Sequence, residues 1–104
     1  LGDTTSAVES DLIQIDAPEI AENGAVVPIK ISSDIENADS IRLYVEKNPT
    51  PLIATVQLTK YTDNFVFTRV KMRETSNVIA MVKAGDTLYM TKRKVKVTAG
   101  GCGG

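Results

Sequence analysis

Several residue types on which enzymes depend are scarce in this sequence. Its 104 residues include no histidine, no tryptophan and only one cysteine. Without histidine, the chain cannot assemble a Cys-His or Ser-His catalytic pair or a metal site built on imidazole nitrogens. A single cysteine also excludes a thiolate metal site and an internal disulfide. We therefore expect neither a bound metal nor a cofactor.

Charge of either sign is not in excess, and long apolar runs are missing. Twelve Lys and Arg residues are balanced by thirteen Asp and Glu residues, which gives a formal net charge of −1. This balance and the low aromatic content of 5% argue against nucleic acid or a membrane as partner. No apolar run reaches the roughly 18 residues of a membrane span, and the N-terminus lacks the pattern of a signal peptide. The length fits one domain with one core.

Alternation of apolar and polar residues is the main structural signal. Segments typical of strands, most of them alternating and one, 77–84, apolar on both faces, recur with turn residues between them: 12–15, 25–32, 41–46, 52–58, 65–72, 77–84 and 87–98. This spacing, without an amphipathic helical stripe longer than two turns, predicts an all-β fold. We expect an immunoglobulin-like antiparallel β-sandwich of about seven strands, with a small barrel as the alternative.

The same pattern predicts domain limits and a core. Residues 1–98 form the sandwich, of which 1–11 are a poorly ordered leader, and residues 99–104 form a mobile C-terminal arm. Pro28 is expected at an edge or a bulge, because proline cannot donate to a ladder. Phe65, Phe67 and Met72 are expected in the core, although a strand face left uncovered would be a partner surface. Alternation assigns eight further residues to the core: Val27, Ile29, Ile31, Ile41, Leu43, Val45, Val56 and Val82.

The only cysteine lies third from the C-terminus, in Gly100-Gly101-Cys102-Gly103-Gly104. A structural thiol is expected inside a strand or helix among apolar neighbours, whereas this one lies at a terminus. Glycine has no Cβ, so the four glycines leave the backbone unrestricted and thin enough to enter a narrow cleft. The pattern indicates an accessible thiol on a flexible arm, and its glycine neighbours offer no catalytic base.

A basic run precedes this arm. Lys92, Arg93, Lys94 and Lys96 lie in the last predicted strand. They are candidates for steering anionic sulfur species or acidic partners toward the cysteine. The simpler interpretation, which the alternation with Val95 and Val97 favours, is a solvated strand face whose lysines protect an exposed edge.

Motifs along the whole chain resemble a known family. The Gly-Gly-Cys-Gly-Gly ending is similar to that of SoxY, the carrier subunit of the Sox thiosulfate-oxidising system. Weaker motifs follow in the order expected of that family: Glu22-Asn23-Gly24-Ala25, Val27-Pro28, Asn48-Pro49-Thr50-Pro51, Thr68-Arg69-Val70-Lys71-Met72 and Thr75-Ser76. The resemblance covers nearly the entire chain.

The resemblance implies a covalent carrier and not an enzyme. Sulfur intermediates would remain attached to Cys102 while the c-type cytochrome SoxAX conjugates thiosulfate, the manganese hydrolase SoxB releases sulfate, and SoxCD oxidises the remaining sulfur. It also implies a heterodimer with SoxZ and a periplasmic location, the leader having been cleaved from this chain. Taken alone, the chain is expected to self-associate through an apolar surface or through a Cys102 disulfide.

Two other functions compete with the carrier. A secreted β-sandwich interaction module would use Cys102 only for an intermolecular disulfide, which the lone cysteine allows but the four glycines do not explain. A ubiquitin-like carrier would be activated at its terminal Gly-Gly, but it needs a helix packed on its sheet, and the sequence shows no long amphipathic helix.

Overall fold

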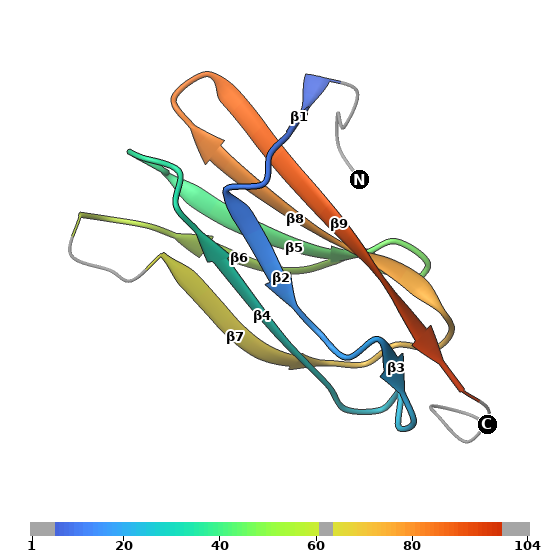
Figure 1. Ribbon diagram of the computed structural model, residues 1–104. Helices are drawn as coiled ribbons and strands as arrows, with labels where there is room; N and C mark the ends of the chain where they lie inside the picture. Colours follow the sequence, from blue (N-terminus) through green and yellow to red (C-terminus); the bar gives the residue numbers. More distant parts are fainter. Residues whose placement is uncertain (1–5, 61–63, 99–104) are drawn as a thin grey trace.

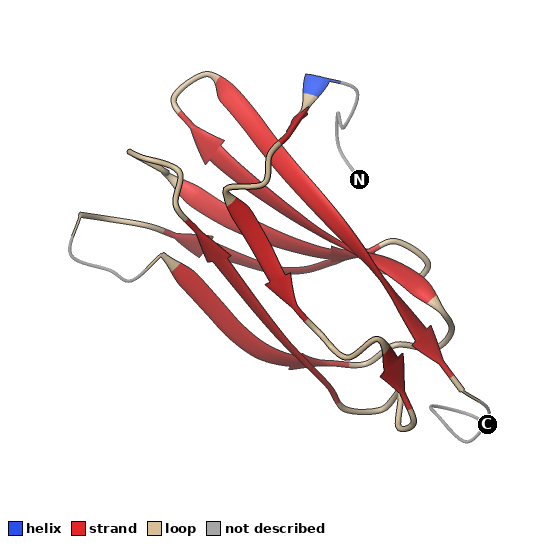
Figure 2. Ribbon diagram, viewed as in Figure 1, coloured by secondary structure: helices blue, strands red, loops and turns tan. Residues whose placement is uncertain are grey.

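A computed structural model describes residues 6–60 and 64–98, which fold into two β-sheets packed face to face (Figure 1). Apart from a helical turn at Ser6, the described residues form strands and loops (Figure 2). None of them lies in a helix long and apolar enough to cross a membrane. The all-β sandwich expected from the alternation is confirmed.

Nine strands are present in the described part of the chain. Their bounds are β1 Val8–Glu9, β2 Ile13–Asp16, β3 Ile20–Ala21, β4 Val27–Ser33, β5 Ser40–Val45, β6 Leu52–Gln57, β7 Phe65–Val70, β8 Ser76–Ala84 and β9 Thr87–Val97. The seven longer strands correspond to the seven segments predicted as strands. The other two, β1 and β3, have two residues each, too few to show a period.

The larger sheet has the order β1-β9-β8-β5-β6, and β3 also pairs with β9. Its centre is the hairpin of β8 and β9, which stay in register from Ser76↔Val95 to Ala84↔Thr87. Gly85 opens the connecting turn with φ +61°, a conformation that favours glycine. Its N–H donates to Asp39 Oδ2 at 2.9 Å, which ties the turn to the loop before β5.

The smaller sheet has the order β2-β4-β7 and is antiparallel throughout. Pro28 was expected at an edge position or a bulge, and it lies in β4, the central strand of this sheet. Pro28 is nevertheless paired on one side only: β7 reaches it through Arg69, while β2 ends opposite Lys30. The missing N–H of proline is tolerated there because no second neighbour is present to accept it.

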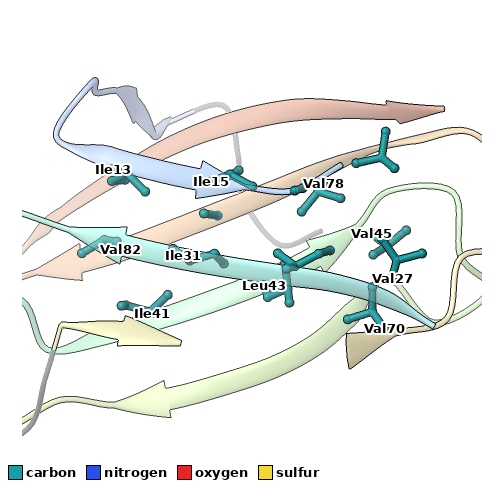
Figure 3. Close-up of a cluster of buried hydrophobic side chains, with 14 of the residues drawn as sticks. Ile13, Ile15, Val27, Ile31, Ile41, Leu43, Val45, Val70, Val78 and Val82 are labelled. Carbon is teal, nitrogen blue, oxygen red and sulfur yellow. The ribbon is translucent and has the colours of Figure 1, made fainter. Parts of the chain in front are cut away.

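The core fills the space between the sheets, as the close-up in Figure 3 shows. Seven of the eight residues assigned to the core are buried, and Val56 is half-buried but packs against the others. Met72 is buried as expected. A second cluster of Tyr44, Ile79 and Met81 lies on the opposite face of the larger sheet, with Ala7 and Met90 packed against it. Strand β8 is therefore buried on both faces, as its apolar composition indicates.

The leader assigned to residues 1–11 is partly structured. Residues 1–5 lie outside the described part of the chain, but Val8 and Glu9 form β1, parallel to Tyr89 and Met90 of β9. Ser10 N–H continues this pairing by donating to the Met90 carbonyl at 2.9 Å. This segment is ordered by backbone hydrogen bonds to a strand about eighty residues away in sequence. The local sequence contains no pattern that predicts these bonds.

Candidate functional site

The cysteine and glycines assigned to the site, Cys102 with Gly100, Gly101, Gly103 and Gly104, lie outside the described residues. The last described residue before them in the sequence is Thr98, directly after the end of β9. What the structure describes of the candidate site is therefore the strand that leads to the cysteine.

The end of β9 is held by hydrogen bonds from two directions. Val97 N–H donates to Thr75 Oγ1 at 2.9 Å, and the Thr75 hydroxyl contacts the Val97 carbonyl at 3.5 Å. On the other side, Lys96 N–H donates to the Glu19 carbonyl at 3.0 Å and Thr98 N–H to the Ala21 carbonyl at 3.2 Å. The chain is thus fixed up to Thr98, four residues before the cysteine.

Local sequence explains why β3 reaches this position. The Ala17-Pro18 pair ends β2, because the residue before a proline is restricted and proline has no N–H for the ladder. The chain then turns to lie parallel to β9, with Ile20 opposite Lys96 and Ala21 opposite Val97. Ala21 is buried in the core, and this burial holds the short strand in place.

The four basic residues do not form one patch. Successive side chains of a strand point to opposite faces. Lys92, Lys94 and Lys96 therefore share the outer face of the larger sheet, where Lys92 pairs with Ile79 of the second cluster. Arg93 lies on the other face. A depression beside β9 is lined by Lys92 as well as Arg93, together with Thr91, Gln14 and Ile15. All four basic residues are exposed, while Val95 between them is fully buried, as the half-buried strand predicts.

A second surface, which the sequence analysis raised only for the case of an uncovered strand face, lies on the smaller sheet. Phe65 and Phe67 of β7 were expected in the core, and this is wrong: they are 44% and 54% exposed. Both faces of β7 carry apolar residues, so alternation alone does not show which face is covered. The two rings lie on the outer face, over which no other strand of the described chain packs.

Cations accompany these two rings. Lys30 Nζ lies 5.1 Å from the centre of the Phe65 ring, and Arg69 Cζ lies 5.6 Å from the centre of the Phe67 ring. Both distances are within the range of a cation–π interaction. Lys30 faces this surface because it pairs with Phe67 across the ladder of β4 and β7. The signal in the sequence was the run of alternate residues Phe65, Phe67 and Arg69.

No other chemical centre is evident among residues 6–60 and 64–98. They contain no group of three or more Cys, Asp or Glu side chains arranged to hold a metal ion. The turn at Asn48-Pro49-Thr50-Pro51 is anchored by Asn48 Nδ2, which donates to the Lys71 carbonyl at 2.7 Å.

Comparisons with known proteins agree with one another. The model of the family "Sulfur oxidation protein SoxY" matches residues 1–102. Among solved structures, the sulfur carrier protein SoxY from Chlorobium limicola f thiosulfatophilum is 41% identical, with a TM-score of 0.81, and the match covers 88% of this chain and 83% of that one. A search of curated proteins gave no match.

More distant structures share the fold alone. A superoxide reductase (neelaredoxin) from Ignicoccus hospitalis is 16% identical with a TM-score of 0.72, over 94% of this chain and 87% of that one. The PKD domain of an M14-like peptidase from a Thermoplasmatales archaeon is also 16% identical, with a TM-score of 0.57, over 85% and 94% of the two chains. Three proteins with different names thus share one sandwich architecture, so the fold does not determine the function.

Proposed function

The chain belongs to the SoxY family, whose role is that of a sulfur carrier in sulfur oxidation, and we propose that it holds thiosulfate-derived sulfur covalently on Cys102. The single observation that supports this is the anchored end of β9. The strand is hydrogen-bonded from both sides up to Thr98. Four extended residues span at most about 14 Å, so the thiol is presented within a short radius of a fixed point.

The first chemical step joins the thiol to thiosulfate. The Cys102 sulfur forms a bond to the outer sulfur of S₂O₃²⁻, giving Cys–S–S–SO₃⁻, one proton and two electrons. The electrons pass to the c-type haem protein SoxAX, which is the oxidant. This step requires no base on the carrier, because the enzyme that receives Cys102 provides the group that accepts the proton.

The second step is hydrolytic and removes the oxidised sulfur. Water attacks the sulfonate sulfur, the S–S bond to that sulfur breaks, and sulfate leaves while a persulfide remains on Cys102. The manganese hydrolase SoxB would perform this step, and SoxCD would oxidise the retained sulfur further. In both steps Cys102 contributes a bond to sulfur, and the enzymes contribute the catalytic groups.

The glycines and lysines have separate parts in this proposal. Gly100, Gly101, Gly103 and Gly104 present no side chain, so an enzyme channel admits the backbone on either side of the sulfur. Lys92, Lys94 and Lys96 form a positive face on the strand that leads to the cysteine, which raises the local concentration of anionic sulfur species. The heterodimer with SoxZ and the periplasmic location belong to the same proposal.

Intact mass spectrometry tests the attachment. The reduced protein is incubated with thiosulfate and SoxAX, and the mass is expected to rise by one S₂O₃ group. Treatment with SoxB then leaves a single additional sulfur atom. Cys102→Ser is the control and is expected to show neither adduct while its melting temperature is unchanged.

The competing function gives a different result in the same experiment. An interaction module that uses Cys102 only for an intermolecular disulfide would form a dimer that reductant separates, and it would gain no S₂O₃ group. Absence of the adduct from the wild-type protein, with SoxAX shown to be active on a known carrier, would refute the proposal.

A further inference from the structure

The loop motifs that the sequence analysis singled out meet at one end of the sandwich. Met72 N–H donates to the Gly24 carbonyl at 2.7 Å. Asn48 Nδ2, in the turn between β5 and β6, donates to the Lys71 carbonyl at 2.7 Å. Three loops that lie far apart in sequence are therefore joined by hydrogen bonds.

The strand that leads to the cysteine ends in the same place. Lys47 N–H donates to Ser76 Oγ at 3.0 Å, and Val97 N–H donates to the Oγ1 of Thr75, the residue before it. Figure 1 shows the connections β5–β6 and β7–β8 on the same side of the molecule as the end of β9. An enzyme that admits Cys102 approaches this end, because four extended residues span at most about 14 Å.

A depression of about 210 Å³ lies between these two connections. The described residues that line it, which we call the turn pocket, are Asn48, Pro49, Thr50, Lys71 and Arg73. None of these residues is acidic, and two of them are cations. The turn pocket therefore favours a negatively charged ligand.

The two cations point outward because the residue between them points inward. Met72 is fully buried in the core, whereas Lys71 and Arg73 on either side of it are exposed. The backbone of this segment is held by the bonds to Gly24 and Asn48. The charges thus project from a fixed backbone into solvent.

One polar atom of the turn pocket has no partner. Asn48 Oδ1 is buried and accepts no hydrogen bond within the described chain. Such atoms are costly, and they are few in folded proteins. Because this oxygen is an acceptor, it favours a ligand that brings an N–H donor. A peptide brings that donor together with a carboxylate, whereas thiosulfate and sulfate bring only acceptors.

We propose that the turn pocket docks an acidic peptide segment beside the channel of an enzyme that receives Cys102. A carboxylate of that segment lies between Lys71 and Arg73, and the Arg73 guanidinium binds both of its oxygens. A backbone N–H of the segment donates to Asn48 Oδ1. The Asn48 side chain as a whole is only partly buried, so a small shift on binding brings this oxygen within reach. The proposal rests on the carrier function and adds the chemistry by which a partner is recognised.

A second contact near the base of the arm suits a carrier. The arm alone is expected to bind weakly, because its glycines lose backbone freedom when a channel orders them. A contact at the turn pocket raises the effective concentration of the thiol at that channel. Because a charged contact at a rim acts mainly on the rate of association, the carrier is still released after the reaction.

An NMR titration tests the ligand chemistry without any sulfur reaction. The full chain carrying Cys102→Ser is titrated with hexaglutamate, and thiosulfate at the same ionic strength is the comparison. The side-chain amide signals of Asn48 and the backbone signals of Thr50 and Arg73 are expected to shift with hexaglutamate and to stay in place with thiosulfate. No shift with hexaglutamate would overturn the proposal. Equal or larger shifts with thiosulfate would also overturn it, because the pocket would then be an oxyanion site.

Loading kinetics test the docking. With SoxZ present, Lys71→Glu with Arg73→Glu is expected to raise the KM for the carrier in thiosulfate loading by SoxAX about tenfold at low ionic strength. The kcat should not change, because the turn pocket touches no reacting atom. Lys71→Arg with Arg73→Lys keeps both charges and should restore the KM to within about threefold of that of the parent.

A matched control lies away from this end. Arg42 of β5 and Lys83 of β8 are exposed, and Lys83 is close to the turn between β8 and β9, at the opposite end of β8 from Ser76. Arg42→Glu with Lys83→Glu alters the net charge by the same amount as the pocket pair. Its KM should stay within about twofold of that of the parent. The melting temperature and SoxZ binding of every variant are measured first.

Three kinetic results would overturn the proposal. The first is a pocket pair that loads with the KM of the parent, and the second is a control pair that loses as much. The third is a pocket pair that alone no longer binds SoxZ, which would assign the turn pocket to that subunit. Failure of the carrier function is distinguishable, because the wild-type chain would then gain no S₂O₃ group while the NMR titration would still report on the pocket.

Discussion

Strands β7 and β9 both alternate apolar and polar residues, but β9 has neighbouring strands on both sides and β7 has one on a single side. Strand β9 has eleven residues, pairs with β8 from Thr87 to Val95, and is met on its other side by β1 and β3. Strand β7 has six residues and a single neighbour in the described chain. Strand β9 carries four exposed basic residues, and β7 carries one, Arg69. The strand that precedes the reactive cysteine is thus fixed from both sides, whereas the strand with exposed aromatic rings remains open.

This difference separates two requirements of a carrier. A thiol that is passed to an enzyme needs a fixed origin, because uncertainty in the origin adds to the volume that the thiol must search. A contact with another subunit needs free backbone groups and exposed apolar area. The fixed strand end and the exposed apolar edge lie on different sheets, so changes at one are expected to leave the other unaffected.

The largest expected effect compares burial on the two strands. Val95 of β9 is fully buried, and Val95→Ala should lower the free energy of unfolding by about 2 kcal/mol, through lost burial and the cavity left behind. Phe67 of β7 is larger but 54% exposed, and Phe67→Ala should cost about 0.5 kcal/mol or less. Urea denaturation of both variants at low protein concentration measures the difference. Equal losses would mean that β7 is covered in solution.

The second effect concerns the segment after β9. Gly101→Val with Gly103→Val should leave the melting temperature unchanged, because residues 6–60 and 64–98 form the described core without them. Valine is β-branched, so it restricts the backbone and adds width beside the sulfur. We expect thiosulfate loading to fall about tenfold, on the premise that lost access costs on the order of 1.4 kcal/mol. Loading equal to that of the wild type would show that the glycines do not serve access.

The third effect tests the anchor of β9. Thr75→Val is nearly isosteric but removes the acceptor of the Val97 N–H bond of 2.9 Å. Loss of a partly buried hydrogen bond should lower the free energy of unfolding by about 1 kcal/mol. Thr55→Val on β6 is the control, because Thr55 is exposed and should tolerate the change. Hydrogen exchange at Val97 should accelerate in the first variant alone, and unchanged protection there would contradict the anchoring role.

Much of this fold could be predicted from the alternation of residues. The longer strands and nearly all the proposed core follow from period two, because one buried face imposes it. Strands β1 and β3 could not be found in this way, since two residues carry no period and their partner is distant in sequence. The exposure of Phe65 and Phe67 was also hidden, because alternation separates the two faces of a strand without showing which one is covered.

The candidate site, like the fold, could be predicted from the sequence only in part. Cys102 and its glycines were singled out by composition alone, and they remain a proposal because they lie outside the described residues. The basic run was taken as one group, although alternation along β9 already implied that Arg93 faces away from Lys92 and Lys94. The hydrogen bonds that the end of β9 donates to Glu19, Ala21 and Thr75 had no signal in the sequence. They arise from pairing between distant segments.

The smallest expected effect compares basic residues on the two faces of β9. If Lys92, Lys94 and Lys96 steer anions toward Cys102, then Lys94→Gln with Lys96→Gln should slow loading by thiosulfate about twofold at low ionic strength. Arg93→Gln changes the charge of the same strand on the opposite face and should have a smaller effect. Added salt should remove the difference, because the Debye length shortens to about 8 Å at physiological ionic strength. Initial loading rates by intact mass, at two salt concentrations, make the comparison. An equal loss for Arg93→Gln would mean that net charge acts without regard to face, and no loss in either variant would leave these lysines the simpler role of a solvated strand face.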